Sequence, residues 1–104
     1  MLLHIGDNVG LPLERVLFVL NARGMTARTR SCIEQAKKER RYTHCGATPK
    51  AYVVTQERGR EHVYESAIAS ATLEKRWRDE VARRYLTETA VVSVDMAGID
   101  EQLS

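Results

Sequence analysis

Residues 48–77 read TPKAYVVTQERGREHVYESAIASATLEKRW, and this stretch decides the fold. Two β-prone segments, residues 50–55 and 62–66, flank the charged segment 56–61, in which Gly59 is able to adopt positive φ. Apolar segments joined by a short turn that contains glycine are typical of a β-hairpin. The sequence therefore predicts a hairpin at this point.

A helix is predicted directly after the hairpin. Leu73, Trp77 and Val81 recur at every fourth position, which places them on one face of a helix, and charged residues occupy the other faces. Ser70 is a suitable N-cap residue. We expect this helix to end near Tyr85.

The N-terminal part of the chain predicts two further strands. Residues 1–5 are mostly apolar, and residues 6–8, Gly-Asp-Asn, are typical of a tight turn. Pro12 suits a turn or the edge of a sheet. Residues 15–21 form an apolar, β-branched run that predicts a mostly buried strand, and residues 42–45 predict a short one.

A first amphipathic helix is predicted from Thr26 onward. Thr29, Ile33 and Ala36 recur at spacings of four and three, and Thr26 is a plausible N-cap. Four of residues 37–41 are basic. They fall at the C-terminal end of this helix, where the helix dipole favours cations.

These elements together predict an α+β fold with a small antiparallel or mixed sheet, a C-terminal hairpin and two helices. The length of 104 residues fits one domain, which we place at residues 1–85, followed by an acidic C-terminal extension, residues 86–104. The extension contains a β-prone segment, residues 90–94. We expect this segment to add an edge strand, to pair with a neighbouring subunit, or to stay mobile.

The composition predicts a cytoplasmic protein. Hydrophobic residues make up 43% of the chain and charged residues 29%, which is ordinary for a globular domain. The longest apolar run, residues 16–20, is far shorter than the roughly 20 residues that span a bilayer, and the first residues lack the pattern of a signal peptide. No membrane association is expected.

The charge is distributed unevenly, and this predicts an anionic partner. Residues 23–50 carry eight basic and two acidic residues, whereas residues 86–104 carry four acidic residues and no basic one. Basic side chains that contact phosphates supply most of the sequence-independent affinity for DNA. The candidates in the basic helix region are Arg28, Arg30, Arg40 and Arg41. A solvated helix face explains the same charges without any ligand.

Several short motifs resemble those of the bacterial extracellular matrix regulators, the RemA/RemB family. Residues 3–7, LHIGD, resemble the start of the RemB branch. The other matching segments are Pro49-Lys50 and residues 52–55, 63–66 and 72–76. The resemblance covers roughly residues 1–77, and RemB is the nearer branch.

The resemblance implies a homo-oligomeric transcriptional regulator that binds duplex DNA and controls matrix or biofilm genes. In the RemA branch, DNA binding is attributed to an arginine that corresponds to Arg15 and to a pair of arginines in the loop before the hairpin. Ala47 and Thr48 stand at the positions of that pair, while the next basic position is kept as Lys50. The resemblance also implies a ring-shaped assembly, which would multiply modest phosphate contacts.

The missing loop arginines favour a competing hypothesis, because alanine and threonine cannot replace a bidentate guanidinium. In this hypothesis the chain is an oligomeric structural or protein-interaction module that has lost DNA binding. Arg15 and Lys50 discriminate between the two. If both lie on one exposed surface with the helix arginines, DNA binding is favoured, and if they are scattered or paired with carboxylates, the interaction module is favoured.

The sequence favours neither an enzyme nor a cofactor-binding protein. It contains no nucleophile elbow, metalloprotease motif, P-loop or dinucleotide-binding fingerprint. Cys32, His44 and Cys45 raise a third hypothesis, a metal or redox sensor, but their spacing fits no common zinc module. We therefore expect no catalytic residue, no metal site and no cofactor.

Overall fold

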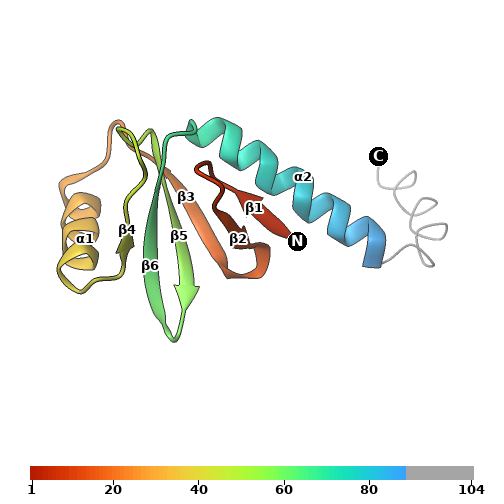
Figure 1. Cartoon of the computed structure of the whole chain (residues 1–104), viewed down its shortest axis with the longest axis horizontal. Coiled ribbons are helices and arrows are strands. Elements are labelled where there is room, and N and C mark those ends of the chain that lie inside the picture. Colours follow the sequence, from red (N-terminus) through yellow and green to blue (C-terminus); the bar gives the residue numbers. More distant parts are fainter. Residues whose placement is uncertain (89–104) are drawn as a thin grey trace.

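The computed structural model of the protein describes residues 1–88 and has the α+β fold that the sequence predicts (Figure 1). In chain order the elements are β1 (Leu2–His4), β2 (Gly10–Pro12), the short 3-10 helix η1 (Leu13–Arg15), β3 (Val16–Asn21), α1 (Ala27–Lys38), β4 (Tyr42–Thr43), β5 (Ala51–Glu57), β6 (Arg60–Ser66) and α2 (Ser70–Glu88). The predicted strand at residues 90–94 and most of the predicted extension lie outside the described residues.

A four-stranded sheet in the order β3-β5-β6-β4 forms the centre of the molecule. All neighbouring strands in it are antiparallel except β4 and β6, which are parallel. The predicted hairpin is β5–β6, and its register runs from Ala51 opposite Ser66 to Glu57 opposite Arg60. Only Arg58 and Gly59 form the turn, both with positive φ, so the strands extend further than predicted.

Both faces of this sheet are covered, because successive side chains of a strand point to opposite faces. On one face, Val53 packs with Leu3 of β1 and Leu73 of α2, which are all fully buried. On the other face, Val54 and Ala36 of α1 belong to a second, smaller core. Figure 1 shows α1 on one side of the sheet and the β1–β2 pair with α2 on the other.

The N-terminal strands form a separate two-stranded sheet. Leu2 lies opposite Pro12 and His4 opposite Gly10, so the proline ends a short strand, consistent with the edge position that the sequence predicts. The turn at residues 6–8 has positive φ at all three positions, as its Gly-Asp-Asn sequence favours. Leu3 and Leu11 of this small sheet, together with Ile5 and Leu13 next to it, make up half of the buried residues of the larger core.

Both helices form close to where the sequence predicts them. Thr26 caps α1, since its side chain accepts a hydrogen bond from the backbone N–H of Thr29 at 3.2 Å. α1 ends at Lys38, so Arg40 and Arg41 follow the helix and do not belong to it. α2 is longer than predicted and continues three residues past Tyr85. Within residues 1–88, neither helix combines the length and the apolar composition that a membrane span requires.

Candidate nucleic-acid interface

Arg15 and Lys50 lie at opposite ends of the four-stranded sheet. Arg15 precedes Val16, which pairs with Thr55, whereas Lys50 directly precedes β5. Lys50 and Thr55 are five positions apart, which corresponds to about 17 Å at the usual rise of a strand. Of the two arrangements that discriminate between the hypotheses, the single chain therefore shows the one in which Arg15 and Lys50 lie apart.

Arg15 lies beside an ionised carboxylate, that of Glu57. Glu57 accepts hydrogen bonds from the hydroxyls of Tyr64 at 2.6 Å and Thr55 at 2.8 Å. Burial raises the pKa of the Glu57 carboxyl, but these hydrogen bonds and the charges of His62 and Arg15 outweigh burial, and the pKa falls below its usual value. Arg15 is therefore near a negative charge, but it forms no ion pair with Glu57.

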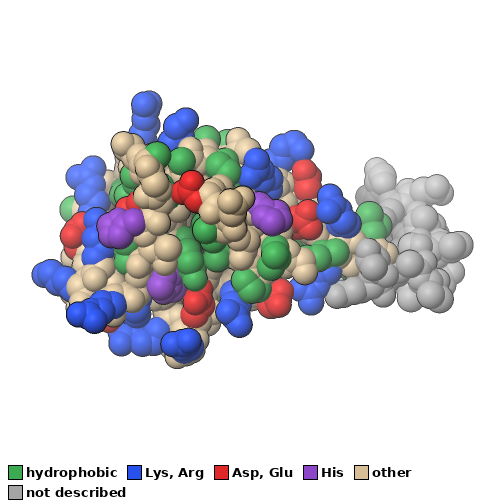
Figure 2. Space-filling view, in the orientation of Figure 1, with side chains coloured by type: hydrophobic (Ala, Val, Ile, Leu, Met, Phe, Trp, Pro, Cys, Tyr) green, Lys and Arg blue, Asp and Glu red, His purple; other side chains and the backbone are tan. Residues whose placement is uncertain are grey.

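Four arginines line one concavity at the turn between β5 and β6. They are Arg40, Arg41, Arg58 and Arg60, and the concavity, which Glu57, Glu61 and His62 also line, has a volume of about 390 Å³. We call the four arginines the hairpin-end cluster. Figure 2 shows blue side chains gathered at the lower left, over the end of α1 and this turn. The sequence predicted Arg40 and Arg41 and missed the two arginines of the hairpin, which become neighbours only when the strands pair.

Two of these arginines are held by a glutamate, and two are not. Glu39 accepts from Arg60 Nη2 at 2.6 Å and from Arg41 Nη2 at 2.9 Å. Arg41 also donates from Nη1 to the backbone oxygen of Glu61. Arg40 and Arg58 form no ion pair with any side chain among residues 1–86. Their guanidinium groups are the part of the cluster best placed to bind an anion.

A second basic concavity lies at the opposite end of the sheet. Arg23 and Lys50, which we call the loop-end pair, line a space of about 520 Å³ together with Thr48 and the first residues of α2. Neither of the two forms an ion pair within the described part of the chain. Lys50 is fixed by its backbone, since its N–H donates to Ser66 at 2.8 Å and its oxygen accepts from Ala22 at 3.0 Å. Arg23 was not predicted from the sequence.

The loop that leads to Lys50 is fixed by two carboxylates. The backbone N–H of Cys45 donates to Glu65 at 3.0 Å, and that of Gly46 donates to Asp7 at 3.1 Å. The hydroxyl of Tyr42 also donates to Glu65. The loop at residues 44–50 is thus held in a defined conformation.

Arg28 and Arg30 are exposed on the first half of α1. Positions two apart on a helix project in nearly opposite directions, so these arginines do not share a surface. The six residues predicted from the sequence therefore fall into three groups: Arg15 with Arg40 and Arg41 near the hairpin end, Lys50 at the loop end, and the two arginines of α1.

Cys32, His44 and Cys45 do not form a metal site. Among residues 1–88 no three His, Cys, Asp or Glu side chains are grouped so that they could hold a metal ion. His44 instead contacts the Glu65 carboxylate at 3.3 Å, and both cysteines are free thiols. The sensor hypothesis therefore has no support in this part of the chain.

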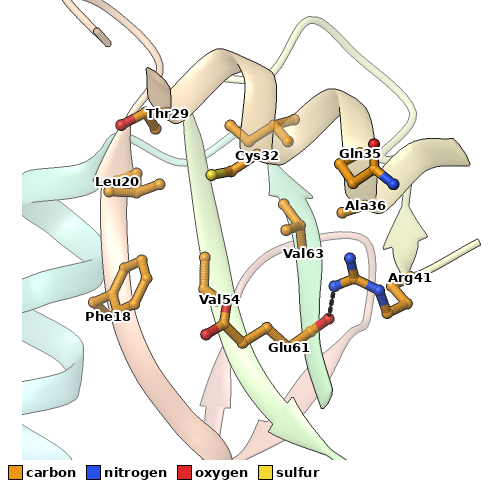
Figure 3. A pocket seen from close by; sticks show the side chains of 11 residues that line it. Phe18, Leu20, Thr29, Cys32, Gln35, Ala36, Arg41, Val54, Glu61 and Val63 are labelled. Atoms are coloured by element: carbon orange, nitrogen blue, oxygen red, sulfur yellow. Dashed lines mark hydrogen bonds between the residues drawn. The ribbon is translucent and has the colours of Figure 1, made fainter. Parts of the chain in front are cut away.

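An apolar groove of about 330 Å³ opens between α1 and the sheet, beside β3. Phe18 and Leu20 line its outer side, Val54 and Val63 form its floor, and Cys32 lies opposite on α1 (Figure 3). Phe18 is 43% exposed and Leu17 is 40% exposed. The prediction that residues 15–21 are mostly buried is wrong, because β3 lies at the edge of the sheet.

No protein-family model matches the chain, and no curated protein matches it significantly. Function is therefore inferred from the residues themselves.

Proposed function

We propose that the chain binds duplex DNA through its phosphate backbone and acts as a cytoplasmic, homo-oligomeric transcriptional regulator of the RemA/RemB type. The observation that supports DNA binding best is the hairpin-end cluster, in which four arginines share one concavity. Arg40 and Arg58 form no ion pair with the side chains of residues 1–86 and remain available for phosphates. The proposed role is binding and not catalysis.

Arginine suits this task, because its planar guanidinium offers several donors that match the geometry of a phosphate group. Each phosphate that a basic side chain neutralises releases counterions, so affinity falls as salt concentration rises. One chain supplies few such contacts. An oligomer repeats them along the duplex, and this repetition raises the total affinity without any new contact.

The test is a salt titration of binding to labelled duplex DNA. We expect the double variant Arg40→Ala/Arg58→Ala to bind more weakly and to reduce the slope of log K against log salt by about two. The matched control is Arg78→Ala, which removes an exposed arginine of α2 outside the cluster. Absence of binding by the native chain at low salt, or an equal loss with Arg78→Ala, contradicts the proposal.

The separation of Arg15 from Lys50 favours the second candidate, an oligomeric interaction module without DNA binding. Arg15 lies beside the ionised Glu57, and Arg41 and Arg60 are both held by Glu39. If this candidate is correct, the chain self-associates but shows no salt-dependent binding to DNA.

A further inference from the structure

The outer edge of β3 is an open strand edge. Within residues 1–88, β3 is the last strand of the four-stranded sheet and pairs only with β5. Its six residues, VLFVLN, include no charged side chain. Open edges of soluble proteins are normally protected by charges, prolines or a covering element, because their free N–H and C=O groups attract another strand. This edge has a bulge near Leu17 but no charge.

The hydrogen bonds of β3 show which backbone groups face outward. Ala22 donates its N–H to the oxygen of Lys50 at 3.0 Å, in the same register that pairs Leu20 with Tyr52. In an antiparallel ladder, hydrogen-bonded pairs alternate along the strand. Leu20 therefore directs its backbone groups towards β5, whereas Val19 and Asn21 direct theirs away from the sheet. A strand that joins this edge must bond to the outward groups.

We propose that β3 pairs antiparallel with β3 of a second copy of this chain, with Val19 on the twofold axis. Only registers that place outward residues opposite outward residues allow the hydrogen bonds to form, and the register centred on Val19 does so. It also places Phe18 opposite Leu20 of the second copy on both sides of the axis. The grooves that these two residues line then join into one apolar surface (Figure 3).

A second copy fits this edge for two reasons. An antiparallel pair of identical strands is self-complementary under twofold symmetry, and the uncharged residues 16–21 oppose no like charges. Side chains that are now 40% and 43% exposed, Leu17 and Phe18, lie on the strand that would be covered. The partner is therefore identified by a backbone ladder and by apolar side chains on one strand.

The pairing also joins the two basic ends, and this part of the inference rests on the proposed DNA binding. Antiparallel strands bring Arg15 of one copy close to Arg23 of the second copy, and the Lys50 of that copy lies one strand further, at the usual spacing of about 5 Å. Within one chain Arg15 and Lys50 are about 17 Å apart along the strand direction. Each end of the joined sheet thus combines the hairpin-end cluster of one copy with the loop-end pair of the other.

Cysteine cross-linking tests the register. In a background of Cys32→Ser/Cys45→Ser, Val19→Cys places two thiols opposite each other, with Cα atoms about 5.5 Å apart, which allows a disulfide. We expect a covalent dimer on a non-reducing gel after mild oxidation. The control, Asn21→Cys, lies four residues out of register with its own copy and should stay monomeric.

Each outcome of this test is decisive. A folded Val19→Cys variant that gives no covalent dimer overturns the proposed pairing, and so does an Asn21→Cys variant that cross-links equally well. Circular dichroism establishes that each variant is folded. Phe18→Lys, which places a charge on the exposed edge, should shift the sedimentation of the otherwise native chain towards the monomer. Unchanged self-association with this variant also counts against the pairing.

A DNA titration of the cross-linked dimer separates the two proposals. We expect oxidised Val19→Cys to bind labelled duplex DNA at least about tenfold more tightly than its reduced form at low protein concentration, since the two basic ends are then joined. A covalent dimer that binds no DNA contradicts the proposed function and leaves the pairing intact. If reduced, monomeric Val19→Cys binds DNA as tightly as the oxidised dimer, the pairing does not join the two basic ends, and the proposed function stands.

Discussion

β5 and β3 are neighbours in one sheet and have similar apolar sequences, yet they occupy opposite environments. β5 has a strand on each side and a core on each face, and its Val53 is fully buried. β3 has a strand on one side only, and its Phe18 is 43% exposed. The same residue types therefore contribute stability in the central strand and accessible surface at the edge.

The largest expected loss of stability comes from a substitution in the central strand, β5. Val53→Ala removes two buried methyl groups from the larger core and should lower the free energy of unfolding by about 2 kcal/mol. Phe18→Ala removes more atoms, but from a half-exposed site, and should cost less than about 1 kcal/mol. Urea denaturation of both variants measures the difference. An equal loss of stability would mean that β3 is as buried as β5.

The next largest loss of stability is expected from removal of a buried hydroxyl on β6. Ser66 is fully buried, donates to the backbone oxygen of Ile5 at 2.7 Å and accepts from the N–H of Ile68 at 3.1 Å. Ser66→Ala leaves both backbone groups without this partner, which should cost about 1–3 kcal/mol. Ser31→Ala, at an exposed position of α1, is the control. A neutral Ser66→Ala variant would show that other groups replace both hydrogen bonds.

The loss of stability at acidic pH should depend on Glu65. Burial raises the pKa of its carboxyl, but hydrogen bonds from the Tyr42 hydroxyl and the Cys45 N–H outweigh burial and lower it. A carboxyl whose pKa is lower in the folded state contributes stability above its unfolded pKa of about 4.3 and loses it as pH falls through the folded value.

Unfolding free energies of the native chain and of Glu65→Gln, measured from pH 7 down to pH 3, test this linkage. The variant should be less stable at neutral pH, and the difference should shrink as the pH falls. Tyr42→Phe, which removes one of the hydrogen bonds, should show part of the same change. Parallel stability curves for Glu65→Gln and the native chain contradict this role.

Much of the fold could be predicted, because local sequence determines it. Glycine at position 59 fixes the turn of the hairpin, Thr26 caps α1, and the spacing of Leu73 and Trp77 identifies the inner face of α2. The order of the strands in the sheet could not be predicted in this way. Nothing in the apolar run of β3 distinguishes an edge strand from a central one, since that depends on which strands pair across long stretches of chain.

The candidate site was only partly predictable for the same reason. Arg40 and Arg41 belong to a basic run that is visible in the sequence. Arg58 and Arg60 follow only after β4 and β5, and they become neighbours of that run through the pairing of β5 with β6. Whether Arg15 and Lys50 share a surface could not be predicted, because it depends on how β3 pairs with β5. The antiparallel register of β3 and β5 separates them within one chain.

The smallest expected effect concerns the acidic residues beyond α2. Residues 89–104 contain Asp95, Asp100 and Glu101 and no basic residue, so they carry a charge opposite to that of the two basic ends. Truncation after Glu88 should therefore strengthen DNA binding a few-fold at low salt, and the gain should disappear at high salt, where such charges are screened. Since the truncated chain keeps β3 complete, its self-association should not change. Unchanged DNA affinity would mean that the acidic residues do not act on the basic surface, and a change in self-association would mean that they contribute to the subunit contact in place of β3.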